Sequence, residues 1–378
     1  MGKKIFSWKW MIASTVLFLA KCKIPFDPHV KNAKSQFLVV EGYINANGET
    51  SINLSRTRNI TWGDTASYKN ELNAKVVIED NFQDIFPLTE NTAGNYSGNY
   101  FLNSSAKYRL HVTTTENKEY VSDFIDLKNS PSEELGWKFD NGNVQIYVNA
   151  KDEDNKTRFY RWSYSETWEF HSQYYSNIVY NPLDSTVIPR TVPVFVCYRS
   201  GKSSQIILGT SAKLKEDVID ERPIVLIPQH DRRISVLYSI LVTQYALDSA
   251  AYNYWNAMKS NTENVGSLFD PQPNQTRGNI HCVSDSSELV IGYIGAGATQ
   301  ERRLFINHSS MPGNWNVAPN CTEYEVPPDS ILFYFGSGAL IPYLKDSVRD
   351  VTKGYFSASD ICVDCTLTGT LVKPSFWP

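Results

Sequence analysis

Short segments in which aromatic and apolar residues alternate with polar ones recur along this chain. Residues 158–170 (RFYRWSYSETWEF) and residues 143–149 (NVQIYVN) alternate in this way. Successive side chains of a strand point to opposite faces of a sheet, so a period of two is that of half-buried strands. The 22 Tyr and 18 Phe residues agree with this, because aromatic side chains are enriched in strands. The pattern therefore predicts a mainly β protein.

Clusters of turn-forming residues divide the strand candidates into two regions. Residues 91–95 (NTAGN) are one such cluster, and residues 129–132 (NSPS) mark the clearest boundary between the regions. Before this boundary we expect an antiparallel β-sandwich of the Ig-like or prealbumin-like kind over residues 36–130. Its strand candidates are residues 37–44, 51–55, 74–79, 84–88, 108–113 and 120–127.

The second region, residues 131–378, is expected to form another β-rich sandwich domain that ends in a cysteine-containing tail. Besides the two alternating segments above, it has several shorter runs of apolar and β-branched residues. These further strand candidates are residues 204–208, 224–227, 235–245, 289–293 and 304–307.

One helix is predicted within the second region, near residues 248–261. Asp248 or Ser249 can accept a hydrogen bond from the free N–H groups of its first turn. Apolar residues then recur on one face at helical spacing. They are Ala251, Trp255 and Met258. We expect this helix to cover one of the sheets.

The N-terminus has the parts of a secretion signal. Lys3 and Lys4 give it a positive start, and residues 11–20 (MIASTVLFLA) form an apolar run. A helix that spans a bilayer needs about 20 apolar residues, so this run has the length of a signal-peptide core instead. We expect residues 1–21 to be removed as a lipoprotein signal peptide.

A cysteine follows the apolar run almost at once. Residues 19–22 (LAKC) resemble a bacterial lipobox, in which the cysteine receives a diacylglyceryl group, although Lys21 stands where a small residue is usual. We expect lipidation at Cys22 and a proline-containing tether over residues 22–35. Attachment through two or more acyl chains is effectively permanent. An ordinary signal peptide followed by an unrelated cysteine is the alternative.

A series of short motifs follows in order along the rest of the chain. The motifs are Cys22 with residues 25–28 (PFDP), 38–42 (LVVEG), 160–164 (YRWSY), 166–168 (ETW), 238–242 (YSILV), 244–245 (QY), 266–273 (GSLFDPQP), 278–280 (GNI), 362–365 (CVDC) and 374–377 (PSFW). In this order they resemble the Bacteroidota outer-membrane lipoproteins that carry domain of unknown function 4249. Such proteins are generally encoded beside TonB-dependent receptors, so the resemblance implies a receptor partner and a role in nutrient uptake. It supplies no catalytic residues.

The resemblance and the lipid anchor together indicate a protein of the cell envelope, attached to the outer membrane. The residues that directly follow Cys22 are not acidic. Acidic residues at that place are associated with display on the outer face. The periplasmic face and the cell surface therefore both remain open as locations.

Five cysteines follow Cys22, which is an odd number for an oxidising compartment. Cys362 and Cys365 lie in a tail rich in Thr and Gly, away from any βαβ unit, so a structural disulfide is favoured over a redox or metal role. We expect the tail to be pinned through Cys321 or Cys282, with one thiol left free. The candidate disulfide cysteines are Cys282, Cys321, Cys362 and Cys365.

No pattern in the sequence indicates catalysis or a bound cofactor. The six histidines form no HExxH motif, so we predict no metal site. Residues 104–107 (SSAK) fit S-x-x-K, but the companion motifs of that chemistry are absent. The net charge of −4, without a basic stripe, argues against binding to nucleic acid. A non-enzymatic protein is therefore expected.

The aromatic row offers a binding hypothesis from the residues alone. Most aromatic side chains of residues 158–170 are expected to fill the core of a sandwich. Tyr174 and Tyr175 can continue the row into an exposed loop. There they and Trp168 could contact a sugar, a peptide or the receptor, because aromatic residues anchor interfaces.

Three functions agree with these observations. The first is a non-enzymatic outer-membrane lipoprotein that captures a ligand for a TonB-dependent receptor or covers the mouth of that receptor. The second is a secreted glycan-binding module or hydrolase; a hydrolase needs two carboxylates about 5–10 Å apart in a cleft. The third is a structural or adhesive envelope protein without a concave aromatic site.

Overall fold

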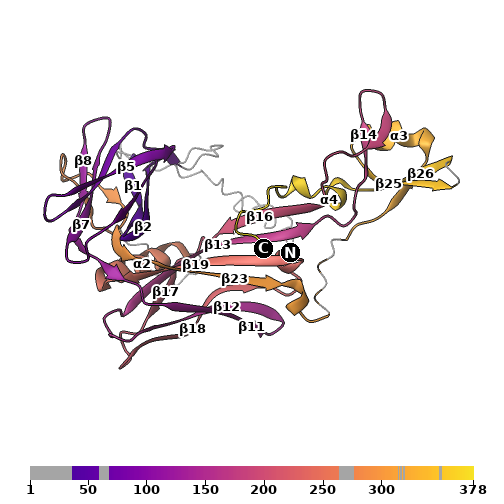
Figure 1. Ribbon diagram of the computed structural model, residues 1–378. Coiled ribbons are helices and arrows are strands. Elements are labelled where there is room, and N and C mark those ends of the chain that lie inside the picture. Colours follow the sequence, from indigo (N-terminus) through magenta and orange to yellow (C-terminus); the bar gives the residue numbers. More distant parts are fainter. Residues whose placement is uncertain are drawn as a thin grey trace, which may run out of the picture.

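The computed structural model describes residues 36–58, 68–263, 276–313, 315, 317, 320–348 and 351–378. Strands dominate, which confirms the prediction of a mainly β sandwich fold. They form three parts, an N-terminal sandwich, a central sandwich and a smaller distal lobe at the far end (Figure 1). The expected signal peptide, tether and Cys22 lie outside the described residues. Within the described ranges, no helix combines the length and apolar character needed to cross a membrane.

The N-terminal sandwich contains the first ten strands and three strands that come much later in the chain. The early strands are β1 (Leu38–Asn45), β2 (Asn47–Thr57), β3 (Tyr68–Asn70), β4 (Lys75–Asp80), β5 (Ile85–Thr92), β6 (Asn95–Phe101), β7 (Lys107–Thr113), β8 (Glu119–Ser122), β9 (Ile125–Asp126) and β10 (Lys128–Asn129). The late strands are β20 (Ile280–Cys282), β21 (Val290–Ile291) and β22 (Gly295–Ala298). Pairing runs in the order β10-β22-β1-β2-β6-β5-β4-β7-β8-β20.

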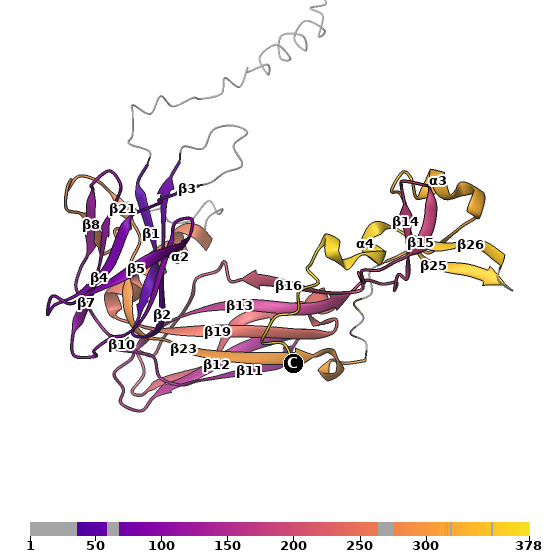
Figure 2. The same cartoon turned by 45° about the horizontal axis from the view of Figure 1, so that its top comes forward.

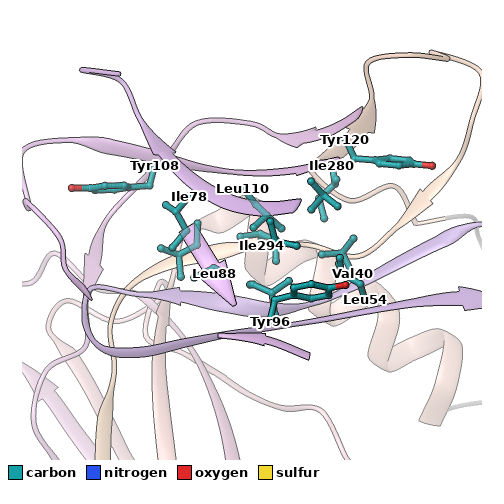
Figure 3. Packing of buried hydrophobic residues seen from close by; sticks show 14 of the residues in the cluster. Val40, Leu54, Ile78, Leu88, Tyr96, Tyr108, Leu110, Tyr120, Ile280 and Ile294 are labelled. Atoms are coloured by element: carbon teal, nitrogen blue, oxygen red, sulfur yellow. The ribbon is translucent and has the colours of Figure 1, made fainter. Parts of the chain in front are cut away.

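Residues 280–298 thus return to the N-terminal sandwich, whereas the sequence pattern placed them in the second region. β22 lies parallel to β1 and to β10, and β20 pairs with β8. This close approach requires glycine, because a Cβ on Gly292 would lie 2.1 Å from the Val40 carbonyl oxygen. Ile280 and Ile294 complete the core beside Leu110 (Figure 3). Strands this short contain too few positions to show a period in the sequence.

The central sandwich consists of two sheets. The first contains β11 (Glu133–Asp140), β12 (Asn143–Asp152) and β18 (Asp217–Ile227); the second contains β13 (Phe159–His171), β16 (Val196–Lys202), β17 (Ile207–Thr210), β19 (Leu237–Leu247) and β23 (Gln300–Asn307). A short helix, η1 (Arg232–Ile234), precedes β19. Val144 and Ile146 of β12 pack in one cluster with Tyr160 and Trp162 of β13. Part of the predicted aromatic row therefore fills the core.

Helix α2 (Ser249–Glu263) follows β19 where the two sandwiches meet (Figure 1). The Asp248 carboxylate accepts the N–H of Ala251 at 2.7 Å, as the cap predicted for this helix requires. Ala251 and Tyr254 are its buried residues. Tyr254 packs against Tyr293 of the returning segment, with ring centroids 5.1 Å apart. The spacing predicted Trp255 and Met258 on the buried face with Ala251, but both are only partly buried, and Tyr254 is the second buried residue. The reason is that the helix contacts both sandwiches rather than one sheet.

The distal lobe lies at the opposite end of the central sandwich from the N-terminal one (Figure 2). Its elements are β14 (Ile178–Asn181), β15 (Thr186–Pro189), β24 (Tyr324–Val326), η3 (Pro328–Ser330), α3 (Ile331–Tyr334), β25 (Ile341–Val348), β26 (Val351–Ala358) and α4 (Asp360–Val363). A turn, η2 (His308–Ser310), leads towards the lobe, and η4 (Cys365–Leu367) begins the way back. The tail then bonds to β16, where Thr370 and Tyr198 exchange backbone hydrogen bonds of 2.8 and 2.9 Å.

Two disulfides hold the lobe and the tail. Cys321 bonds to Cys362, which is one of the pairings expected from the sequence. Cys365 bonds to Cys197, a residue that the sequence did not single out. The prediction for Cys282 is wrong: its thiol is free and buried, because β20 carries it into the core of the N-terminal sandwich.

Candidate functional site

A pocket of about 490 Å³ lies between the N-terminal sandwich and the central sandwich. β1 and β2 form one wall, which includes Tyr43 and Asn45. β13, β19 and α2 form the other wall, together with the loop of residues 203–206. Pockets between two structural units are common binding sites in proteins.

The junction that forms this pocket is held by specific contacts. The Tyr43 ring stands edge-on to Tyr245, with centroids 5.0 Å apart, and the Tyr43 hydroxyl lies 3.5 Å from the Ala246 carbonyl oxygen. Ser130 of the linker donates to the Gln244 carbonyl oxygen at 3.1 Å and accepts the Ala246 N–H at 2.9 Å. Burial of the Tyr43 hydroxyl raises its pKa. These contacts hold the two sandwiches against one another at the edge of the pocket.

Arg161 is the charged group at the centre of this site. Its guanidinium carbon lies 4.4 Å from the centroid of the Tyr245 ring and 4.4 Å from that of the Trp255 ring. Such stacking on two rings fixes the plane of the guanidinium. Burial lowers the pKa of Arg161. Among the described residues it has no carboxylate partner within 4.0 Å, and its buried Nε–H donates no hydrogen bond.

The rest of the lining is polar or acidic. Ser163, Ser204 and Gln205 contribute side chains to the pocket, and the Ser163 hydroxyl lies 3.3 Å from that of Tyr245. Three exposed carboxylates also line the pocket. They belong to Glu41, Glu49 and Glu301. One stacked cation, hydroxyl groups and carboxylates give a site that can bind a polar, singly charged anion. Within the described part of the chain, no group of three His, Cys, Asp or Glu side chains could hold a metal ion.

The aromatic residues predicted from the sequence do not meet at one site. Tyr174 stacks on Tyr343 in the distal lobe, with centroids 4.5 Å apart, and its hydroxyl donates to the Cys321 carbonyl oxygen at 3.3 Å. Tyr175 is exposed and packs edge-on against Phe195 at 5.5 Å. Tyr174 therefore has a structural position, and Tyr175 alone of this pair faces solvent.

Trp168 lies elsewhere, on the face of β13 that is opposite to Arg161, where it lines a second pocket. In the sequence, Arg161 is one of the polar residues that alternate with aromatic ones in residues 158–170, and nothing else marks it. A charged residue in the middle of a long alternating strand was the available signal. Its partners Tyr245 and Trp255 come from other elements, so the stack could not be read from one segment.

The fold and the site define a class, a protein of two packed β-sandwiches with an arginine-bearing pocket at their junction. A family model described as Domain of unknown function (DUF4249) matches residues 23–303, and the chain belongs to that family. The matched range covers the N-terminal sandwich and most of the central sandwich, and it ends within β23. Of the distal lobe it includes only β14 and β15. The motif at residues 266–273 lies outside the residues that the structure describes.

The other comparisons add little. No curated protein matches the chain. Among solved structures, chitinase ChiA74 from Bacillus thuringiensis is similar at a TM-score of 0.16 and 8% identity, over 48% of this chain and 30% of the chitinase chain. A match this weak, over less than a third of that enzyme, carries no argument about fold or function.

Proposed function

We propose that this protein is a non-enzymatic lipoprotein of the outer membrane that captures a carboxylate-bearing ligand and works with a TonB-dependent receptor. The lipid anchor at Cys22 rests on the N-terminal sequence. The receptor partner rests on the family resemblance, which membership of the DUF4249 family supports.

The observation that carries ligand capture is the guanidinium of Arg161, which is stacked between Tyr245 and Trp255 without a carboxylate partner among the described residues. A partly desolvated charge is unfavourable unless an ion of opposite sign joins it. The edge of a guanidinium can bind both oxygens of a carboxylate. The stack leaves that edge, and not its faces, for a ligand.

The acidic lining narrows the class of ligand. The lining contains three exposed carboxylates, those of Glu41, Glu49 and Glu301, beside the single guanidinium of Arg161. Their negative charge repels an anion that carries several charges. A ligand with a single carboxylate and hydroxyl or amide groups fits this balance best, because the Ser and Gln side chains of the lining can bond to such groups.

Binding can be tested on the chain produced without residues 1–22, called the soluble chain below. The assay is the fluorescence of its tryptophans, since Trp255 lies on Arg161. The probes are monocarboxylates that fit the pocket: glucuronate, hexanoate and N-acetylated amino acids, with glucose as the uncharged control. We expect at least one to bind, and Arg161→Gln to weaken it about tenfold or more, as the loss of charge-assisted hydrogen bonds predicts. Arg303→Gln, on β23 outside the pocket, is the matched control. Equal affinity in Arg161→Gln, or no binding by any probe, contradicts ligand capture at this site.

The anchor and the partner need a separate experiment on the full-length chain in its native membrane. We expect metabolic palmitate labelling that is lost in Cys22→Ser, and co-purification of an outer-membrane barrel after mild solubilisation. A chain that carries no label contradicts the lipid anchor, and a chain recovered without a barrel protein contradicts the receptor partner. Neither outcome affects the test of ligand binding at Arg161.

A further inference from the structure

The second sheet of the central sandwich extends past the first one. β13 has 13 residues, whereas β11 of the facing sheet has 8. At the far end of β13, Trp168 and Phe170 point to the same side as the core residue Trp162. A pocket of about 340 Å³ lies there, and none of β11, β12 or β18 contributes to its lining. Trp168 therefore stays partly exposed beyond the facing sheet, whereas Phe170 is buried against the Cys197–Cys365 disulfide and beneath Arg232.

Two arginines lie on this aromatic surface. The guanidinium of Arg232 is 4.2 Å from the centroid of Phe170, and one of its Nη atoms donates to the His171 carbonyl oxygen at 3.3 Å. The guanidinium of Arg199 is 5.9 Å from the centroid of Trp168, the residue directly opposite it across the sheet. Neither arginine has a carboxylate within 4.0 Å among the described residues.

The carboxylates of the same pocket are already occupied. Glu166 accepts hydrogen bonds from Arg233 at 3.1 and 3.3 Å and from the Tyr238 hydroxyl at 2.7 Å. Asp231 bonds to the same Arg233 at 2.9 Å. Arg199 and Arg232 are therefore left as two uncompensated positive charges, in a chain whose net charge is −4. Burial, together with the charge of Arg199, lowers the pKa of Arg232, as expected for two cations that face one another.

We propose that this pocket binds the phosphate or sulfate monoester group of a small soluble molecule, with Arg199 and Arg232 as its donors. An oxyanion with two negative charges compensates both guanidinium groups and removes their mutual repulsion. Among its described lining residues, the junction pocket has one cation without a carboxylate partner, together with exposed acidic residues, so the two sites differ in the ligands they take. They also lie on opposite faces of β13.

Titration calorimetry on the soluble chain tests this assignment with four probes: glucose 6-phosphate, glucose 6-sulfate, inorganic phosphate and uncharged glucose. We expect the monoesters to bind, glucose not to bind, and affinity to fall as salt is added. Arg232→Gln and Arg199→Gln should each weaken monoester binding about tenfold or more. Arg232→Lys should restore only part of the affinity, because a lysine lacks the guanidinium fork.

Arg303→Gln is the matched control. Arg303 also stacks on an aromatic ring, that of Phe376 at 3.7 Å, but it does not line this pocket. Arg199 is exposed, so Arg199→Gln keeps the test valid should Arg232→Gln fail to fold. Monoester binding that persists in both pocket variants, that falls equally in Arg303→Gln, or that is absent from the parent chain overturns the proposal.

Discussion

Glu133, at the start of β11, is a buried acid whose replacement by glutamine should stabilise the protein at neutral pH. Its side chain is 3% exposed, and within the described structure neither carboxylate oxygen accepts a hydrogen bond. Burial raises the pKa of Glu133 to about 8, and the charge of nearby Arg302 offsets only part of this rise. The ordinary value of this pKa is 4.5. Between pH 4.5 and about 8, Glu133 therefore keeps a proton in the folded chain that it has mostly lost in the unfolded chain.

The sign and size of the effect follow from the difference in bound protons. Since the folded state binds more protons, the free energy of unfolding falls as pH rises from about 4.5 to about 8, by about 1.4 kcal/mol for each pH unit. At pH 7 the buried carboxyl group therefore lowers the free energy of unfolding by about 3 kcal/mol. A glutamine does not titrate, so Glu133→Gln should be more stable than the parent by up to that amount at pH 7 and nearly equal to it at pH 4.5.

The assay is urea denaturation of the soluble chain at a series of pH values, followed by tryptophan fluorescence and by circular dichroism. Glu134→Gln is the matched control, because Glu134 is the next residue and is exposed. Its stability should track that of the parent at every pH. If Glu133→Gln is less stable than the parent at pH 7, or if their difference does not change with pH, the carboxylate is ionised in the folded state and the reasoning fails.

Two further predictions concern the junction and the tail. Gln244→Ala should lower the free energy of unfolding by about 2–4 kcal/mol in the same urea assay. It removes the acceptor of the Trp162 indole N–H (3.0 Å) and the donor to the Pro131 carbonyl oxygen (2.8 Å) in a fully buried site. A loss below about 0.5 kcal/mol would show that these groups find other partners. Cys197→Ser combined with Cys365→Ser opens a loop with a sequence separation of 168 residues. In the chain-entropy model this double variant should lower the free energy of unfolding by about 4–5 kcal/mol, measured by calorimetry without reductant. An unchanged melting temperature would contradict this prediction.

The alternation of apolar and polar residues was sufficient to predict the long strands and the β class. The predicted segment at residues 158–170 corresponds to β13 (Phe159–His171), and that at 143–149 lies within β12 (Asn143–Asp152). The cap at Asp248 also correctly predicted the start of α2. These features are local, since periodicity and capping depend on residues close in sequence.

The parts that could not be predicted depend on residues far apart in the chain. The glycines of residues 292–297 let the returning segment lie against β1 and β10, yet a glycine in isolation indicates only a loop. The bond between Cys197 and Cys365 needs the tail to lie on β16, which no spacing in the sequence reveals. The stack on Arg161 likewise requires β13, β19 and α2 to be packed first.

One strand, β13, positions the key residues of both proposed sites. Its alternation sends Arg161 to the junction pocket and sends Trp168 and Phe170 to the pocket of the arginine pair. A shift of β13 by one residue against β19 would exchange the two faces, so that Arg161 would enter the core and Trp162 would leave it. The burial of Trp162 in the core therefore fixes the register of β13. Through this register it also fixes the side on which Arg161 lies and the opposite side on which Trp168 and Phe170 lie.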